Sequence, residues 1–107
     1  MTIQYKWTQL EKVIARRTFD RAYSKECTHI FNKVKVMLSN MKDPKEIWKI
    51  GDYLYKEQIK TSEKYDYRYS VLIMVFGRLM RDGLIEEPDL HGLEQEKIER
   101  IKFISSL

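Results

Sequence analysis

The residue types that most often perform catalysis are scarce and scattered in this sequence. It contains one cysteine, Cys27, and two histidines, His29 and His91. One cysteine permits neither an internal disulfide framework nor a cysteine-based metal site, and two separated histidines do not make a conventional zinc cluster. The sequence has no Gly-rich phosphate loop, H-E-x-x-H motif or nucleophile elbow. We therefore expect no enzyme, no cofactor and no metal.

The polar residues with the clearest chemistry are suited to recognition of another chain. Asp52 lies four residues after Trp48 and three before Tyr55, so in a helix the three share one face. A carboxylate among aromatic rings costs free energy unless another group pairs with it, and aromatic residues beside a charge are typical of interface hot spots. Asp52 and, further along, Gln58 are candidate partner-binding residues. The alternative for Asp52 is a solvated acid at the rim of a dimer interface.

Three tyrosines alternate with Lys64 and Arg68 in segment 64–69. Aromatic rings interleaved with bases can stack on single-stranded nucleic acid. The helix expected next is an apolar core helix, however, and lacks the polar residues of a base-reading helix. We favour the interpretation that these tyrosines pack two parts of the protein together, and we keep a small helical nucleic-acid-binding module as an alternative.

Composition indicates a single helical domain. The 107 residues are 43% apolar and 34% charged, with only four glycines and two prolines, too few for a fold of many strands and tight turns. The net charge of +4 divides into +6 on residues 1–60 and −2 on residues 61–107. The basic half could attract an acidic protein, nucleic acid or an anionic membrane surface, although most of these charges fit solvated helix faces. With no apolar signal region and no apolar run long enough to span a bilayer, we expect a cytoplasmic protein.

A first long helix is predicted from Thr8 to Met41, after a short lead anchored only by Trp7. Thr8 and Glu11 form a capping box, and neither Gly nor Pro interrupts the segment. Apolar residues recur at alternating spacings of four and three, which is a heptad seam expected to bury Cys27. The seam comprises Tyr23, Cys27, Ile30, Val34, Met37 and Met41, widened by Phe31 and Leu38. Its phase breaks before Tyr23, so Leu10, Val13 and Ile14 must pack differently, across a bend or on another subunit.

A second helix, capped by Asp43 and Glu46, is predicted from Pro44 to about Thr61 or further. The short connection folds it back on the first helix as an αα-hairpin. It carries two apolar stripes, so we expect one to face its own chain and the other a second chain. The inner stripe is Ile47, Ile50 and Leu54, and the outer stripe is Trp48, Tyr55 and Ile59, with Asp52 among them.

Gly51 lies in the interior of this second helix, where glycine costs roughly 1 kcal/mol relative to alanine. Close approach of the two helices is the favoured explanation. In the alternative, a partner side chain fills the space beside Trp48.

The remainder of the chain is predicted to form a small helical head. Thr61–Tyr69 reads as a hinge in which Ser62 or Asp66 caps a third helix, which ends at Asp82 with Gly83 just beyond. A last helix from about Leu93 presents Leu93, Ile98, Ile101 and Ile104 on one face. The predicted fold is all-α and homodimeric, a single domain of residues 1–107, with an elongated antiparallel helical hairpin (stalk) over residues 8–61 and a head over residues 62–107.

Six short motifs, in order along nearly the whole chain, resemble the fluorescence recovery protein family of cyanobacteria. Each motif alone is weak, but their order and spacing together are fairly specific. They are F-x-x-A-Y-x-x-E at 19–26, W-K-I-x-D-Y-L at 48–54, K-Y-D-x-R-x-S-V at 64–71, V-F-x-x-L at 75–79, D-G-L-I at 82–85 and K-I-x-x-I-K at 97–102.

The resemblance implies a dimeric helical regulator with no enzyme activity. Family members bind the C-terminal domain of the orange carotenoid protein and speed its return from the light-activated to the resting form, which ends photoprotective quenching. It also implies a location in the cytoplasm, peripheral to the thylakoid membrane. The implied partner and dimer interface comprises Ile47, Trp48, Gly51, Asp52, Tyr55, Gln58 and Ile59, and the implied head contact comprises Met74 and Arg100.

The sequence departs from the family pattern at three of these positions. Gly51 stands where members carry His, Gln58 where they carry Arg, and Met74 where they carry an apolar aromatic residue. The alternative interpretation is therefore a divergent relative that uses the same dimeric scaffold to bind a different protein.

Overall fold

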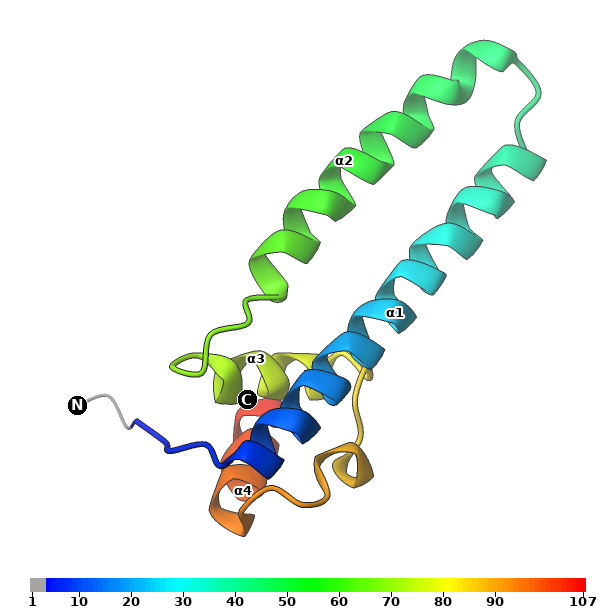
Figure 1. The fold of residues 1–107 in the computed structure, drawn as a ribbon. Helices are drawn as coiled ribbons and strands as arrows, with labels where there is room; N and C mark the ends of the chain where they lie inside the picture. The colour runs from blue at the N-terminus through cyan, green and yellow to red at the C-terminus, as the bar shows by residue number, and fades with distance from the viewer. Residues whose placement is uncertain (1–3) are drawn as a thin grey trace.

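The computed structural model describes residues 4–107, and the chain is helical, as predicted (Figure 1). In this range it contains no β-strand, only an isolated bridge between His91 and Leu93. The elements in order are α1 (Gln9–Ser39), the 3₁₀ turn η1 (Pro44–Glu46), α2 (Ile47–Lys64), α3 (Leu72–Arg81), the 3₁₀ turn η2 (Glu87–Leu90) and α4 (Gln95–Ser105).

The capping box at Thr8 starts α1, as the sequence predicts. The Glu11 amide donates to Thr8 Oγ1 at 3.1 Å, and the Thr8 amide donates to Glu11 Oε1 at 3.0 Å. The helix then runs for 31 residues, roughly 47 Å at about 1.5 Å per residue. This one helix accounts for most of the 53 Å length of the molecule.

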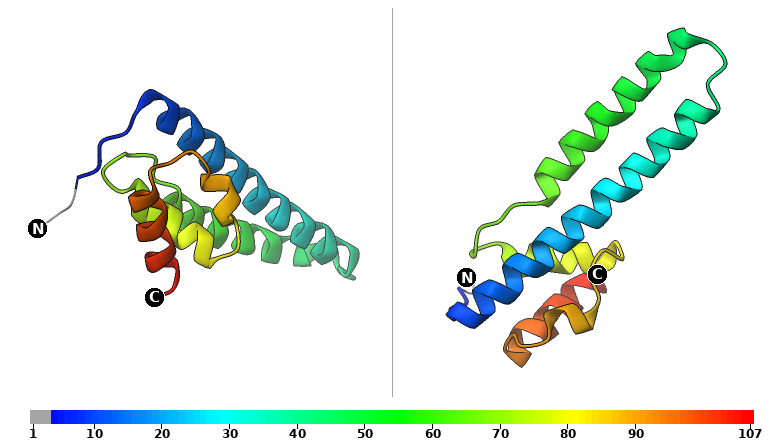
Figure 2. Two further views of the ribbon diagram at one scale, coloured as in Figure 1. Left: turned by 90° about the horizontal axis from the view of Figure 1, so that it is seen from below. Right: turned by 45° about the vertical axis from the view of Figure 1, so that its right-hand side comes forward.

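The capping box at Asp43 also forms, but it opens the 3₁₀ turn η1 before α2. The Lys45 amide donates to Asp43 Oδ1 at 3.0 Å, while Glu46 Oε2 accepts from the Asp43 amide. After this turn α2 runs back antiparallel beside α1 (Figure 1, Figure 2). It continues beyond Thr61 to Lys64, so Ser62 lies inside α2 and does not cap α3.

Helices α3 and α4 and the turn η2 lie against the first half of α1 (Figure 2). Helix α1 contributes Ile14, Ala15, Phe19 and Ala22 to the core of this head. The prediction that Ile14 packs across a bend or on another subunit is therefore wrong, because it meets the head of its own chain. Leu10 and Val13 point away and are exposed.

The apolar faces of α3 and α4 meet as their patterns predict. Leu72, Phe76 and Leu79 are fully buried, and the predicted face of the last helix is buried at Leu93, Ile98, Ile101 and Ile104. Two details differ. Helix α3 begins only after Val71, since Asp66 pairs with Arg68 and caps nothing, and α4 begins at Gln95.

Gly83 adopts φ 76° directly after α3. That left-handed conformation favours glycine, and it ends the helix where predicted.

Two polar clusters tie the elements together. Buried Lys97 donates to Glu11 Oε1 at 2.7 Å and to the Lys6 carbonyl, and it lies 4.7 Å from the centre of the Trp7 ring. Of the predicted frayed lead 1–7, residues 1–3 lie outside the described residues. Trp7 is not the only anchor, because Tyr5 also packs against the core.

At the base of the hairpin, Lys64 Nζ contacts Glu26 of α1 at 2.6 Å and Asp82 of the head at 2.8 Å. Burial alone would lower the pKa of Lys64, but hydrogen bonds to the two carboxylates outweigh it and raise the pKa. Tyr65 and Tyr67 pack edge-on against Phe19, which confirms that the tyrosines join two parts of the protein.

Candidate partner-binding surface

The face of α2 that meets α1 is narrow and only partly apolar. It carries Ile50, Tyr53, Glu57 and Thr61, and Ile50 is the one residue of α2 that is buried. The predicted inner stripe is therefore wrong at two of its three positions. Ile47 is 44% exposed and Leu54 is 42% exposed. Both lie to one side of the line along which α2 contacts α1, which passes through Ile50.

The predicted outer stripe lies fully in solvent. Trp48 is 76% exposed and Tyr55 is 65% exposed, and Ile59 and Asp52 are also exposed. At 3.6 residues per turn, Ile47 and Leu54 lie beside this stripe and not opposite it. Apart from Ile50, the two predicted stripes thus form one apolar band along α2, and the rest of the protomer covers this band only in part.

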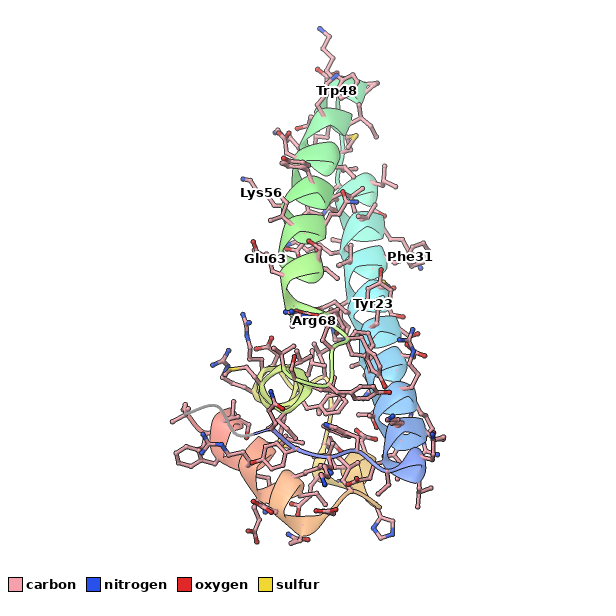
Figure 3. All side chains as sticks on the ribbon, turned by 60° about the vertical axis from the view of Figure 1, so that its left-hand side comes forward. Tyr23, Phe31, Trp48, Lys56, Glu63 and Arg68 are labelled. Carbon is pink, nitrogen blue, oxygen red and sulfur yellow. The ribbon has the colours of Figure 1, made fainter. Side chains whose placement is uncertain are left out.

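Helix α1 borders this band with side chains that the sequence assigned to a buried core. Cys27 is exposed, which corrects its prediction as a buried small hydrophobe, and Leu38 is exposed as well. Phe31 also lies in solvent, as Figure 3 shows. The heptad spacing is real, but α2 covers only one edge of the seam. Its central residues Ile30, Val34 and Met37 are half-buried.

Between α1 and α2 this side of the hairpin is hollowed into a groove of about 460 Å³. Its walls are Tyr23, Cys27, Ile30, Leu54, Glu57, Gln58, Thr61, Ser62 and Tyr65. A second hollow adjoins it, lined by Cys27, Ile30, Phe31, Val34 and Leu54. We call the groove, its adjoining hollow and the apolar band of α2 the stalk face.

Gly51 lies on the stalk face and has free space around it. A Cβ atom placed there would meet no atom within 4 Å. Close approach of α1 and α2, the favoured explanation from sequence, is therefore wrong. A side chain at this position would therefore extend into open space.

The polar candidates of α2 lie on or next to the same face. Gln58 lines the groove. Asp52 is exposed and makes no ion pair within residues 4–107. Both side chains are therefore available to donate to or accept from another molecule.

The remaining predicted site residues lie apart from the stalk, on the head. Met74 of α3 is exposed. Arg100 of α4 is exposed and lies 5.2 Å from the centre of the Phe103 ring, itself an exposed aromatic residue. Seven of the nine predicted residues thus lie on α2, and the other two lie on separate helices of the head.

Sequence reasoning missed the contribution of α1 to the stalk face. The signal was present, since a heptad seam requires a partner helix along its whole width. The error was to assign the whole width of the seam to the second helix, which covers only one edge of it. Tyr23, Cys27, Ile30, Phe31 and Val34 belong with the α2 residues as one surface.

Two further features bear on function. Across residues 4–107, no three His, Cys, Asp or Glu side chains are grouped so that they could hold a metal ion. No helix in the same range is both long and apolar enough to span a membrane.

Over nearly its whole length, the chain is similar in sequence and structure to known proteins of one family. Residues 7–105 match the family described as photoprotection regulator fluorescence recovery protein. The fluorescence recovery protein of Synechocystis sp. is 31% identical over 106 residues, covering 99% of this chain and 97% of the relative. The solved structure of the Synechocystis protein has a TM-score of 0.88 at 31% identity, and that of the Fremyella diplosiphon protein 0.87 at 30%. In both cases 95% of this chain and 100% of the other are covered.

Proposed function

Because the chain belongs to the fluorescence recovery protein family of photoprotection regulators, we propose that it binds the light-activated orange carotenoid protein and accelerates its return to the resting form. In this proposal the active species is a homodimer joined through the stalk face, and the partner is the C-terminal domain of the carotenoid protein. The reaction makes and breaks no covalent bond. It requires only that the regulator bind more tightly to conformations on the way back than to the activated form.

One observation carries the proposal: the stalk face is apolar, hollowed and uncovered in the protomer. Large exposed apolar patches on a soluble domain mark surfaces that bind other molecules. Each apolar side chain buried from water gains roughly 1.5–3 kcal/mol, so covering Trp48, Tyr55 and Phe31 provides a driving force for association. Asp52 and Gln58 supply hydrogen-bonding groups at its edge.

Gln58 and Gly51 set the character of the contact. An amide can both donate and accept hydrogen bonds, but it carries no charge. Gly51 lets a partner approach the backbone of α2 closely, since it has no side chain and nothing lies within 4 Å of the place where its Cβ would be. We therefore expect binding to depend more on apolar burial, and less on salt concentration, than it would with a cation at position 58.

The activity is tested by mixing the protein with photoactivated orange carotenoid protein and following the absorbance in the dark. We expect faster recovery of the orange form, and we expect Trp48→Ala to remove most of the acceleration. Leu10→Ala is a matched control, because Leu10 is a similarly exposed apolar residue at the far end of α1. No acceleration by the unmodified protein would contradict the proposal and favour a relative that serves a different protein.

The dimer is tested separately by light scattering. Ile47→Glu should yield monomers, because it places a charge within the apolar band. Val36→Glu is the control, since Val36 is exposed to a similar degree on a part of α1 directed away from the groove. An unchanged dimer in Ile47→Glu, or equal dissociation by both variants, would contradict the stalk face as the dimer contact.

A further inference from the structure

The side of the hairpin opposite the stalk face has a distinct chemistry. On α2 it carries Lys49, Tyr53, Lys56 and Lys60, which lie on one side of the helix at spacings of four, three and four. On α1 it carries Lys33, whose ammonium lies 4.9 Å from the centre of the Tyr53 ring. We call these five residues the lysine face. Figure 3 shows Lys56 and Phe31 leaving the hairpin on opposite sides.

We infer that the lysine face is a second docking surface, specific for an acidic protein surface, that stays open when the stalk face is covered. This inference concerns a different face from the proposed carotenoid-protein and dimer contact and does not rest on it. Its occupant is recognised by carboxylates spaced to meet several ammonium groups along one side of a helical hairpin.

Charge complementarity is the first argument. Lys33 and Lys56 have no ion pair in residues 4–107. Lys49 contacts Glu46 at 3.4 Å and Lys60 contacts Glu57 at 3.7 Å, and both lysines are mostly exposed. Exposed pairs of this kind contribute little to stability. All four ammonium groups can therefore turn to an incoming carboxylate at small cost.

The position of the head is the second argument, because it makes the lysine face one wall of a corner. Ala15 and Ala22 of α1 are buried against the head, and His29 continues this side of the helix after another seven residues, followed by Lys33. Lys64, at the base of the same side of α2, reaches Asp82 of the head at 2.8 Å. The head thus projects on the side where the lysines lie, as it does in Figure 3.

The shape of this corner and the spacing of its charges favour an acidic protein over an anionic membrane or a nucleic acid. A flat membrane cannot lie along the lysine face, since the projecting head holds it away. A nucleic acid backbone carries closely spaced negative charges, and Glu46, Glu57 and Glu63 interrupt the lysines. A folded protein can fill the corner and place its carboxylates between these acids.

The experiment measures binding of the full-length protein to three probes. The probes are an immobilised glutamate-rich peptide, phosphatidylglycerol vesicles and double-stranded DNA, each at several salt concentrations. Replacing Lys49, Lys56 and Lys60 together by Gln should weaken peptide binding about tenfold, since it removes most of the complementary charge. A control replaces Arg17, Lys35 and Lys102, three exposed cations elsewhere, by Gln; it has the same net charge and should lose less than about twofold. Circular dichroism verifies that both variants fold.

The binding results distinguish an acidic-protein surface from net charge, membrane binding and nucleic-acid binding. A selective loss in the lysine-face variant, with Trp48→Ala unchanged, supports the inference. Equal losses in both triple variants would overturn it, because net charge alone would then account for binding. Tighter binding of vesicles or DNA than of the peptide would also overturn it, in favour of a membrane or nucleic-acid surface.

Discussion

The head buries most of its large apolar side chains, whereas the stalk leaves many of its own exposed. In α3, six of ten residues are buried, whereas in α2 only Ile50 is buried among eighteen. The head also encloses a buried ion pair, with Lys97 1% and Glu11 2% exposed. The stalk keeps Trp48, Tyr55 and Phe31 in water.

This contrast shows which part of the protomer closes its own core and which part does not. The head closes its own core with help from the first half of α1, so its stability belongs to one chain. The hairpin holds α2 mainly at its two ends, by the turn at Asp43 and by the Lys64 cluster, with a thin contact between. Between these ends, many apolar side chains of the hairpin stay exposed and are available to pack on another molecule.

The largest expected effect on the free energy of unfolding comes from replacing phenylalanine by alanine in the head, compared with the same change in the stalk. Phe76→Ala empties a fully buried position of α3 and should destabilise the protein by about 4 kcal/mol. Phe31→Ala removes an exposed ring of α1 and should change the free energy of unfolding by less than about 0.5 kcal/mol. Urea unfolding in an Ile47→Glu background measures both free energies without a contribution from the proposed dimer. Similar losses from the two would remove the contrast.

The buried ion pair gives the next effect. Lys97→Met leaves the Glu11 carboxylate buried without its cation, which should cost about 3 kcal/mol. Lys102→Met is the control on α4, because its pair with Glu87 is exposed. Thermal unfolding should show a large drop in Tm for the first and almost none for the second. Equal Tm values would mean that the pair does not stabilise the head.

Acid should weaken the head through the same pair. Burial by itself raises the pKa of Glu11, but the hydrogen bond with Lys97 and those from the Glu94 and Thr8 amides outweigh it and hold the pKa below its usual 4.5. A carboxylate with a lowered folded pKa stabilises the protein above its unfolded pKa, and that stability disappears as the pH falls through the folded value. We expect Tm to fall below about pH 4.5, and Glu11→Gln to show a shallower fall. Parallel curves for the two proteins would contradict this assignment.

The smallest effect lies at the base of the stalk. Lys64→Met removes the hydrogen bonds to Glu26 and Asp82 and should cost about 1–2 kcal/mol. Hydrogen exchange should accelerate in α2 far more than in α3, because the head core is untouched. Uniform acceleration across both helices would show that the cluster stabilises the whole fold and not the attachment of α2.

The sequence predicted the elements well because their signals are local. The boxes at Thr8 and Asp43, the stop at Gly83 and the apolar face of α4 each depend on residues within a few positions. The head core was recognisable from the continuous apolar run of α3.

The sequence could not decide which molecule covers an apolar seam. Periodicity fixes the side of a helix on which Cys27, Ile47 and Leu54 lie, but the same spacing serves a contact within one chain or between two. The assignment failed at these residues because α2 contacts α1 along a line through Ile50 and covers only one edge of the seam. The space around Gly51 has the same origin.

That space has a practical consequence for engineering. A glycine inside a helix weakens it by roughly 1 kcal/mol relative to alanine, and the free protomer gives Gly51 no steric reason to lack a side chain. Position 51 can therefore take a methyl group without a steric clash in the isolated chain, and larger side chains would extend from there into open space. The size of side chain at which binding begins to weaken would then measure how closely a bound partner approaches α2 at this position.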